Sequence, residues 1–227
     1  MKKNKVFFLL LCILLFMPLL GDFFADVFYV PIAIENRRIL KDDYITSTGE
    51  FGIWRKPYNN LRGHYHTGID FKNPGKKLGA IEPVYACANG IVFSIYSNRS
   101  SSYVIIEHNL RTGKKVYSTY THISDVVVAI GDTVNHFTVI GSFIDHRNLD
   151  KWGEYLNHIH FEILKTIPKL AGIVNERKIY TSYTIDIIKK SELTNYFYDP
   201  KIFFVNRTVW SISVIIILAA TIIATMA

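Results

Sequence analysis

The stretch HYHTGIDF (residues 64–71) and a second stretch, NHIHFEI (residues 157–163), each carry histidines and an acid at short spacings. In a strand, side chains at positions i and i+2 point to the same face. In NHIHFEI, His158, His160 and Glu162 therefore share one face, and apolar residues fill the other. In HYHTGIDF, Gly68 lies between His66 and Asp70 and allows the chain to bend. The two stretches can therefore meet around one metal ion, or they can be unrelated histidine clusters.

A catalytic zinc site typically uses three protein ligands and leaves one position for water. His66, Asp70 and one of the two strand histidines make such a set, and the other strand histidine can act as a general base. His122, in YTHI, lies near the end of another predicted strand. With 8 histidines in the chain, such spacings also arise by chance. A surface or core histidine is the alternative for each one taken singly.

The region around both stretches is typical of antiparallel β structure. Four segments alternate or run apolar over strand lengths, at 90–97, 102–109, 114–123 and 137–144. Turn sequences such as NLRTGKK separate them. No segment between residues 50 and 165 shows helical periodicity, and a short helix is predicted only at 184–194. We therefore predict a mostly β domain of antiparallel sheet over residues 46–205, after an ordered lead-in at 22–45.

Both ends of the chain are apolar. Three lysines precede an apolar run at residues 6–20, which predicts a signal peptide over 1–21, or a signal anchor because the site after Gly21 is a poor cleavage site. Residues 209–227 carry no charge and are long enough to span a membrane as a helix; a buried core helix is the alternative. We predict an exported, membrane-anchored protein that faces the periplasm or the cell wall. The flanking charges do not indicate the orientation of the tail.

Composition argues against several classes of protein. Only Cys12 and Cys87 are present, so no disulfide framework and no cysteine metal cluster is expected, and Cys87 is predicted to be a small buried residue. The net charge is +7, but no basic block interleaved with aromatic residues predicts nucleic-acid binding. A basic exported domain suits an anionic surface such as cell wall or phospholipid. The sequence does not predict an oligomeric state.

The order of the motifs resembles the lysostaphin-type zinc metallopeptidase family, also called the LytM domain. In that family an FG-x-R approach, an H-x-x-x-D pair, a G-x-V strand, a Y-x-H, a GD-x-V turn and an H-x-H-F-E strand follow one another. The matching segments here are STGEFGIWR (47–55), HTGIDF (66–71), VYACANGIV (84–92), YVIIEHN (103–109), YSTYTHIS (117–124), IGDTVNHFTVIGSF (130–143) and HIHFEI (158–163).

The resemblance implies one zinc ion per domain, held by His66, Asp70 and His160. It also implies that His158 and His122 act on the substrate and on water, although which of them takes which part does not follow. Glu162 is expected either to orient a zinc ligand or to be a carboxylate at the rim of the site. The remaining residues have expected places rather than roles: Tyr120 beside the substrate, His64 and His108 outside the ligand set, and His136 and His146 in solvated loops.

Members of that family mostly hydrolyse peptide bonds in bacterial peptidoglycan, in glycine cross-bridges or at D-alanyl linkages. The resemblance therefore implies a zinc-dependent endopeptidase that remodels the cell wall, with peptidoglycan peptides as its partners. A catalytically silent domain of the same fold, which binds the wall or activates an amidase, is the alternative. Two segments depart from the family pattern: a charged loop at 144–157 replaces a short glycine-rich one, and the stretch 166–197 is longer than usual.

Overall fold

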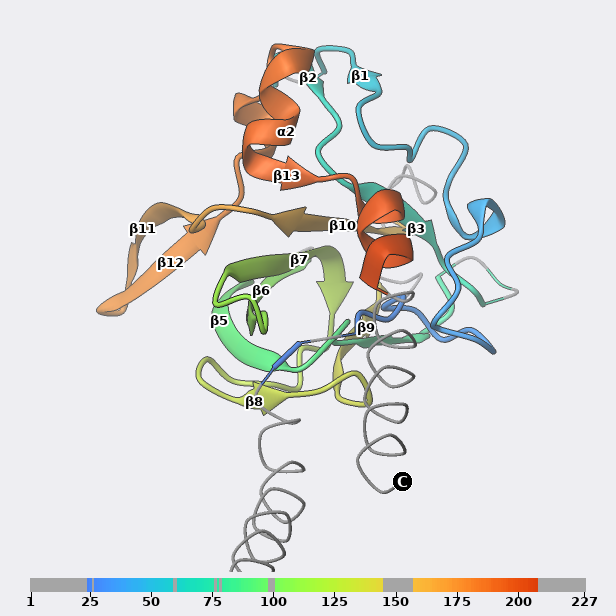
Figure 1. Cartoon of the computed structure of the whole chain (residues 1–227), viewed down its shortest axis with the longest axis vertical. Helices are drawn as coiled ribbons and strands as arrows, with labels where there is room; N and C mark the ends of the chain where they lie inside the picture. Colours follow the sequence, from blue (N-terminus) through green and yellow to red (C-terminus); the bar gives the residue numbers. More distant parts are fainter. Residues whose placement is uncertain are drawn as a thin grey trace, which may run out of the picture.

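The computed structural model describes residues 24–25, 27–58, 61–75, 77, 79–97, 101–144 and 157–207. Its main element is an antiparallel sheet whose central order is β13-β10-β7-β6-β5-β8, with β3 on β10 and with β9 linking β7 to β4 (Figure 1). The predicted class, mostly antiparallel β, is confirmed. The strands are β1 (Trp54–Arg55), β2 (His64–Tyr65), β3 (Ile69–Lys72), β4 (Pro83–Tyr85), β5 (Gly90–Ser97), β6 (Ser102–Asn109), β7 (Lys115–Ser124), β8 (Thr133–Val134), β9 (Val139–Phe143), β10 (His158–Leu164), β11 (Lys169–Val174), β12 (Arg177–Thr181) and β13 (Phe197–Tyr198).

The strands predicted from alternation are present. β5 and β6 have the predicted bounds, and the ends of β7 and β9 differ from the prediction by one or two residues. The described residues between 50 and 165 contain no helix. The helix predicted at 184–194 is instead a series of single turns, because Lys189 is extended and separates Ile187 from Leu193, which are both buried. The helical elements are η1 (Asp42–Tyr44), η3 (Thr184–Asp186), η4 (Lys190–Glu192), α2 (Leu193–Tyr196) and residues 200–207.

The sheet separates two apolar clusters. The larger cluster packs on the face that presents Phe161 and Ile163 of β10, and it includes Phe28 and Ile32 from the predicted lead-in. The smaller cluster lies on the other face and contains Tyr117, Leu164, Ile187, Leu193 and Phe197 among others. Both clusters bury large side chains completely, which is the dominant favourable contribution to folding. The polar side chains of β10 share the face of the smaller cluster.

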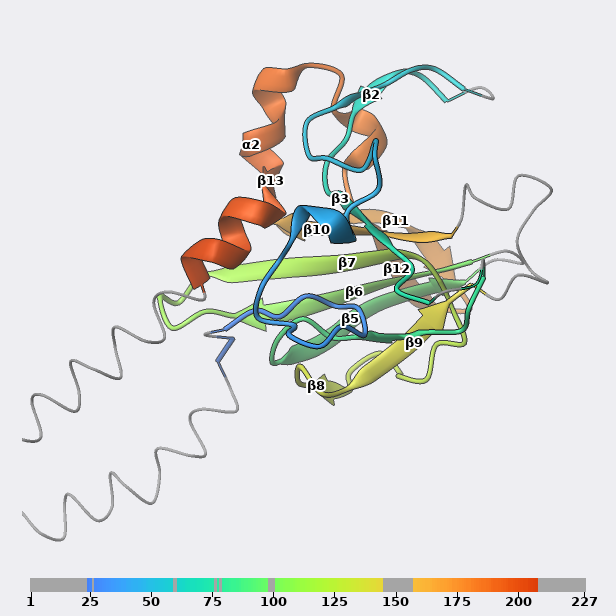
Figure 2. The same ribbon diagram turned by 90° about the vertical axis from the view of Figure 1, so that its right-hand side faces the viewer.

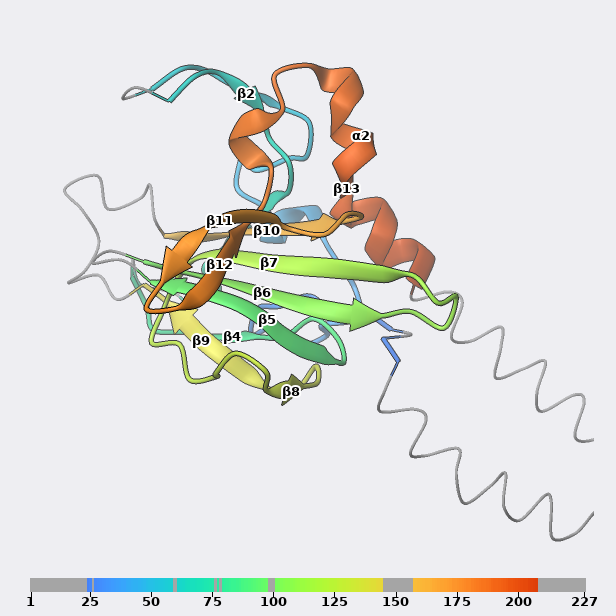
Figure 3. The same cartoon turned by 90° about the vertical axis from the view of Figure 1, so that its left-hand side faces the viewer.

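A hairpin that the sequence analysis did not predict follows β10. Its strands, β11 and β12, pair with each other and with no other described strand. Asn175 and Glu176 connect them, both with positive φ (46° and 66°), as a two-residue type I′ turn requires. The Tyr180 ring packs on Phe93 of β5 at 4.8 Å, and the Tyr180 N–H donates to Ser94 Oγ at 3.0 Å. The hairpin therefore lies over one face of the main sheet (Figure 3).

The described part of the chain contains no helix long and apolar enough to cross a membrane. The predicted signal segment at 1–21 and the predicted transmembrane helix at 209–227 lie outside the described residues, so both stay predictions. The described chain begins and ends at the same end of the domain, as the blue and red segments in Figure 2 show.

Candidate metal centre

The three side chains predicted as metal ligands meet at one point. β3 pairs with β10 so that Asp70 stands opposite His160, and His66 lies just before β3. His66 Nε2 is 3.0 Å from Asp70 Oδ1 and 2.9 Å from His160 Nδ1, and His160 Nδ1 is 3.0 Å from Asp70 Oδ1. All three residues are buried. We call this group the His66–Asp70–His160 cluster.

Contacts on the far side of each imidazole ring indicate which nitrogen carries a proton. His66 Nδ1 lies 2.8 Å from the carbonyl oxygen of Glu50, which can only accept, so Nδ1 donates and Nε2 of the neutral ring keeps its lone pair. His160 Nε2 lies 3.0 Å from Glu162 Oε1, although the contact is not aligned as a hydrogen bond. Its Nδ1 therefore faces Asp70. Two ring nitrogens and a carboxylate oxygen converge on one point, where they repel one another unless a cation lies between them.

This donor set fits a zinc ion. Two imidazole nitrogens and one carboxylate oxygen are ligands that zinc accepts, and three protein ligands leave a fourth position free. Both histidine donors are held from behind, His66 by the backbone of Glu50 and His160 by the Glu162 carboxylate. Such supporting contacts are typical of metal sites.

The charges around the cluster favour a cation there. Burial opposes the charged form of His160, but the Glu162 and Asp70 carboxylates outweigh burial and raise its pKa to about 10. Burial also disfavours the ionised form of Asp70, yet the close contacts with His160 and His66 hold the pKa of that carboxyl well below its usual range. Without a metal the site therefore attracts a proton. A metal ion would take the place of that proton, because both need the same lone pair.

Glu162 is not a carboxylate at the rim of the site. Its side chain is fully buried. Oε1 accepts hydrogen bonds from the hydroxyls of Thr67 and Thr184, and Oε2 accepts one from Thr119 Oγ1 at 2.7 Å. Burial alone would raise the pKa of Glu162, but His160 outweighs it and lowers that pKa to about 2. Of the two expected positions, the structure places Glu162 behind His160, where it can orient that ring.

Arg55 is a contact of the cluster that the sequence analysis missed. The Arg55 guanidinium, from β1, forms an ion pair with Asp70 Oδ2, the oxygen that does not face the two histidines. Its side chain is 27% exposed, and that of Asp70 is 6% exposed. Arg55 belongs to the FGIWR segment that carried part of the family resemblance, so a signal was present. The signal did not indicate which acid the arginine binds.

His158 and His122 lie beside the cluster. His158 Nε2 is 3.8 Å from Asp70 Oδ1, and the ring centroids of His158 and His122 are 5.0 Å apart. His122 has a φ of 65°, a left-handed conformation that is uncommon for a residue with a side chain and is found at functional sites. Its Nδ1 is buried and has no hydrogen-bond partner among the described residues. Burial, followed by the nearby His158 and His160, lowers the pKa of His122 to about 3.

Tyr120 faces the core and not the cluster. Its side chain is fully buried, its ring packs against Phe161 at 5.4 Å, and its hydroxyl accepts a hydrogen bond from the Cys87 N–H at 2.8 Å. The expectation that Tyr120 contacts the substrate is therefore wrong. The physical reason is the left-handed backbone at His122, which breaks the regular alternation that would put both residues on one face.

The remaining histidines that the structure describes lie outside the cluster. His64 is in β2, with Nδ1 3.1 Å from the carbonyl oxygen of Arg62. His108 is buried on the core face, where Nδ1 is 2.7 Å from the carbonyl oxygen of Asn89. His136 lies in the loop between β8 and β9, as predicted, where it is partly exposed and stacks on Tyr29 at 3.9 Å. Cys87 is buried and free, as predicted. His146 lies outside the described residues.

A family match covers the region that holds this cluster. Residues 64–175 match peptidase family M23. The chain therefore carries a peptidase family M23 domain. The resemblance to lysostaphin-type peptidases drawn from the sequence is confirmed. The matched range holds His66, Asp70, His122, His158 and His160, which the structure brings together; the role of each stays a prediction.

The M23 domain also resembles solved structures, while no curated protein matches the chain significantly. A zinc-containing peptidase from Vibrio cholerae has 22% identity and a TM-score of 0.41, over 69% of this chain and 39% of that one, so this chain spans less than half of that protein. The catalytic domain of lysostaphin from Staphylococcus simulans has 20% identity and a TM-score of 0.36, over 69% and 92%. A chain in the SpoIIIAH–SpoIIQ complex has 22% identity and a TM-score of 0.39, over 59% and 92%. The family assignment rests on the match of residues 64–175.

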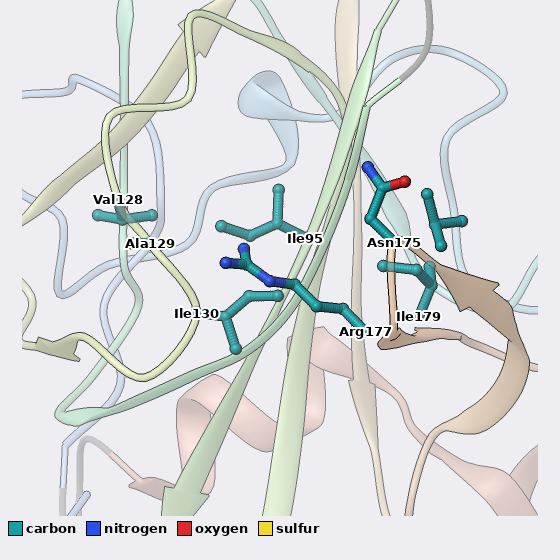
Figure 4. A pocket seen from close by; sticks show the side chains of 8 residues that line it. Ile95, Val128, Ala129, Ile130, Asn175, Arg177 and Ile179 are labelled. Atoms are coloured by element: carbon teal, nitrogen blue, oxygen red, sulfur yellow. The ribbon is translucent and has the colours of Figure 1, made fainter.

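Two open hollows lie beside the β11–β12 hairpin. The first has a volume of about 530 Å³ and includes His122 in its lining. The second has a volume of about 600 Å³ and lies under the tip of the β11–β12 hairpin (Figure 4). Neither lining includes a residue of the His66–Asp70–His160 cluster. Val174 and Ile179 line both hollows, so the two are neighbours.

Proposed function

We propose that the M23 domain is a zinc-dependent endopeptidase that hydrolyses peptide bonds in bacterial peptidoglycan. The observation that carries this proposal is the convergence of three donor atoms, each 2.9–3.0 Å from the other two, with two further histidines beside them. Family membership supports a peptidase. The donor set supports zinc as the metal that the peptidase would use.

In this proposal His66 Nε2, Asp70 Oδ1 and His160 Nδ1 hold the zinc. Zinc bound there supplies a Lewis acid and lowers the pKa of its water ligand to about 7. Glu162 and the Glu50 carbonyl hold the two imidazole rings in the orientation that presents their lone pairs. These contacts keep the donor atoms in place before substrate arrives.

His158 and His122 divide the proton transfer and the charge stabilisation between them. The His158 side chain is 16% exposed, so it can reach substrate and can move a proton from the attacking water to the leaving amine. The low pKa of His122 keeps its ring neutral. One of its ring N–H groups can donate to the oxyanion that develops on the scissile carbonyl, a contribution of about 3 kcal/mol in comparable sites.

The placement of the cluster supports a cell-wall substrate. The described chain enters the domain beside the β6–β7 turn, where the Ala25 N–H donates to the Asn109 carbonyl oxygen at 2.8 Å. His122 lies at the other end of β7, about 20 Å away for an extended strand. If the apolar segments at 1–21 and 209–227 enter one membrane, the cluster faces away from it. We therefore propose an exported, anchored peptidase with its site directed to the wall.

A digest tests the proposed function. The full-length chain, purified in detergent micelles and loaded with zinc, is incubated with isolated peptidoglycan, and the soluble products are weighed by mass spectrometry. The His160→Ala variant is the matched control. New peptide termini with the parent alone support the endopeptidase and identify the bond. If the zinc-bound parent releases no product, the proposal fails and a domain that binds the wall or a partner enzyme without cutting takes its place.

A further inference from the structure

A row of side chains leads from the metal centre across the face of the sheet. His160 of β10 pairs with Thr121 of β7, Thr121 pairs with Tyr103 of β6, and Tyr103 pairs with Tyr96 of β5. Residues that pair directly share a face of the sheet. Adjacent strands are about 4.8 Å apart, so the three steps cover about 14 Å. An extended peptide covers that distance with about four residues.

The first hollow follows this row. Thr121, Tyr103 and Tyr96 line it on the sheet side, and Gly172 and Tyr180 line it on the hairpin side. Its lining contains hydroxyl, aromatic and small side chains but no charged residue. Such a surface suits the backbone and small side chains of a peptide, because ligand sites are mostly apolar with a few polar groups that fix orientation.

The second hollow adjoins the first, because Val174 and Ile179 line both, and it has a different chemistry. Its lining is apolar apart from Asn175 and Arg177 of the hairpin. In Figure 4 the Arg177 guanidinium lies between the side chains of Ile95 and Ile130. No described carboxylate forms an ion pair with Arg177, although Glu176 precedes it in the chain. The second hollow therefore presents one positive charge, without a counter-charge, in apolar surroundings.

We propose that the second hollow binds the carboxylate end of the peptide whose scissile bond lies at the metal centre. Charge complementarity supports this occupant, since arginine binds a carboxylate through two parallel hydrogen bonds. The apolar lining around Arg177 suits a small side chain such as the methyl group of a terminal D-alanine. The distance across the row leaves room for about four residues. The substrate class is therefore a peptide with a free carboxylate a few residues from the cut bond.

This inference rests on the proposed function for the identity of the peptide, so its test measures binding and not cleavage. The probe is a synthetic peptide that ends in D-alanine, made once with a free C-terminal carboxylate and once as the C-terminal amide. Calorimetry compares the dissociation constants of both forms for the zinc-loaded full-length chain in detergent. The His158→Ala background prevents consumption of the peptide. Turnover of the acid form is measured separately in the parent chain.

We expect the acid form to bind about fivefold more tightly than the amide form, the upper range for a solvent-accessible ion pair. Arg177→Gln should remove this preference, and Arg177→Lys should keep part of it. Lys178→Gln is the matched control, because it removes the same charge from the next residue of β12, which does not line the second hollow. The control should keep the full preference.

Equal binding of acid and amide by the parent overturns the subsite. A preference for the acid form that survives in Arg177→Gln also overturns the subsite. Equal weakening of acid and amide binding in that variant overturns it too, because it would indicate that Arg177 acts by packing. A preference that depends on Arg177 without any turnover in the parent supports the subsite and contradicts the endopeptidase. The two proposals can therefore fail separately.

Discussion

The two faces of the sheet each bury histidine, but in opposite chemical settings. On the core face, His108 has a partner for each ring nitrogen: the Asn89 carbonyl oxygen at 2.7 Å and Ser118 Oγ at 2.7 Å. Burial lowers its pKa to about 4. On the other face, carboxylates raise the pKa of His160 to about 10 against the effect of burial. Burial of a histidine therefore does not indicate function by itself. The decisive property is whether the lone pair of the ring already accepts a hydrogen bond from a neighbouring group.

A buried histidine with both ring nitrogens hydrogen-bonded and a candidate metal ligand can therefore look alike in sequence. Both occur in strands that carry apolar residues, in VIIEHN and in HIHFEI. The core histidine accepts from a hydroxyl and needs nothing more. The lone pair of the site histidine instead faces another ring nitrogen and a carboxylate. Four predictions test that distinction.

The largest effect is expected at Asp70. Asp70→Ala removes one donor atom and the only negative charge among the three donors, so stoichiometric zinc binding should be lost. Zinc content after dialysis, measured by mass spectrometry, checks this. Ser118→Ala, which alters the core-face histidine network, should leave zinc content unchanged. Full retention of zinc in Asp70→Ala would contradict the ligand assignment.

The next largest effect is expected at His122. His122→Ala should retain zinc, because its ring is not among the three donors, but should lower kcat about a hundredfold to a thousandfold, as loss of an oxyanion donor does. Initial rates with soluble peptidoglycan fragments measure kcat, and the zinc content of the same preparation shows whether the metal is retained. Undiminished cleavage would remove His122 from the mechanism.

Protonation of His108 should make the free energy of unfolding depend on pH. Its folded-state pKa, about 4, lies below its unfolded value of about 6.5. Between these two values the unfolded chain binds the extra proton, so stability falls as pH is lowered from 6.5 to 4, by about 3 kcal/mol in total. Urea unfolding of the metal-free protein at pH 7 and pH 4 measures the loss.

His108→Gln provides the control for that measurement, because it cannot take up a proton in this range. The variant should lose about 3 kcal/mol less than the parent between the two pH values. The difference between the two proteins isolates His108 from the site histidines, which titrate in both. Parallel losses in parent and variant would contradict the assignment of a neutral, fully satisfied His108.

The smallest effect is expected at Arg55. Arg55→Gln removes the ion pair with Asp70 Oδ2 and leaves all three donors, so zinc affinity should fall about tenfold, within the range for groups behind a ligand. Competition with a fluorescent chelator measures it. Arg62→Gln is the matched control, since Arg62 also lies near the β1–β2 region but contacts Asp186. Equal affinities for parent and Arg55→Gln would show that Asp70 needs no such support.

Local sequence patterns were sufficient to predict much of the fold. β5 and β6 could be read from alternation alone, because each is long, flanked by turns and half-buried. The ligand candidates could be named because their motifs occur in family order. The β11–β12 hairpin escaped prediction because its strands are mostly exposed, so no apolar alternation marks them.

Three features of the site depended on tertiary structure. Alternation placed Glu162 on the face of His160, but only the packing of Thr67 and Thr184 over it made it a buried support and not a rim carboxylate. The partner of Arg55 followed from the position of its side chain beside Asp70 of β3. The left-handed backbone at His122 separated it from Tyr120.

Local sequence was enough to predict the strands and the residue types that can hold a metal, because both depend on neighbours a few positions apart. Only the tertiary structure determined which groups share a site, which face is buried, and where Arg177 meets an apolar hollow. Those properties depend on contacts between segments that are distant in the chain. Local patterns do not encode such contacts, since the same alternation is compatible with many partners across the sheet.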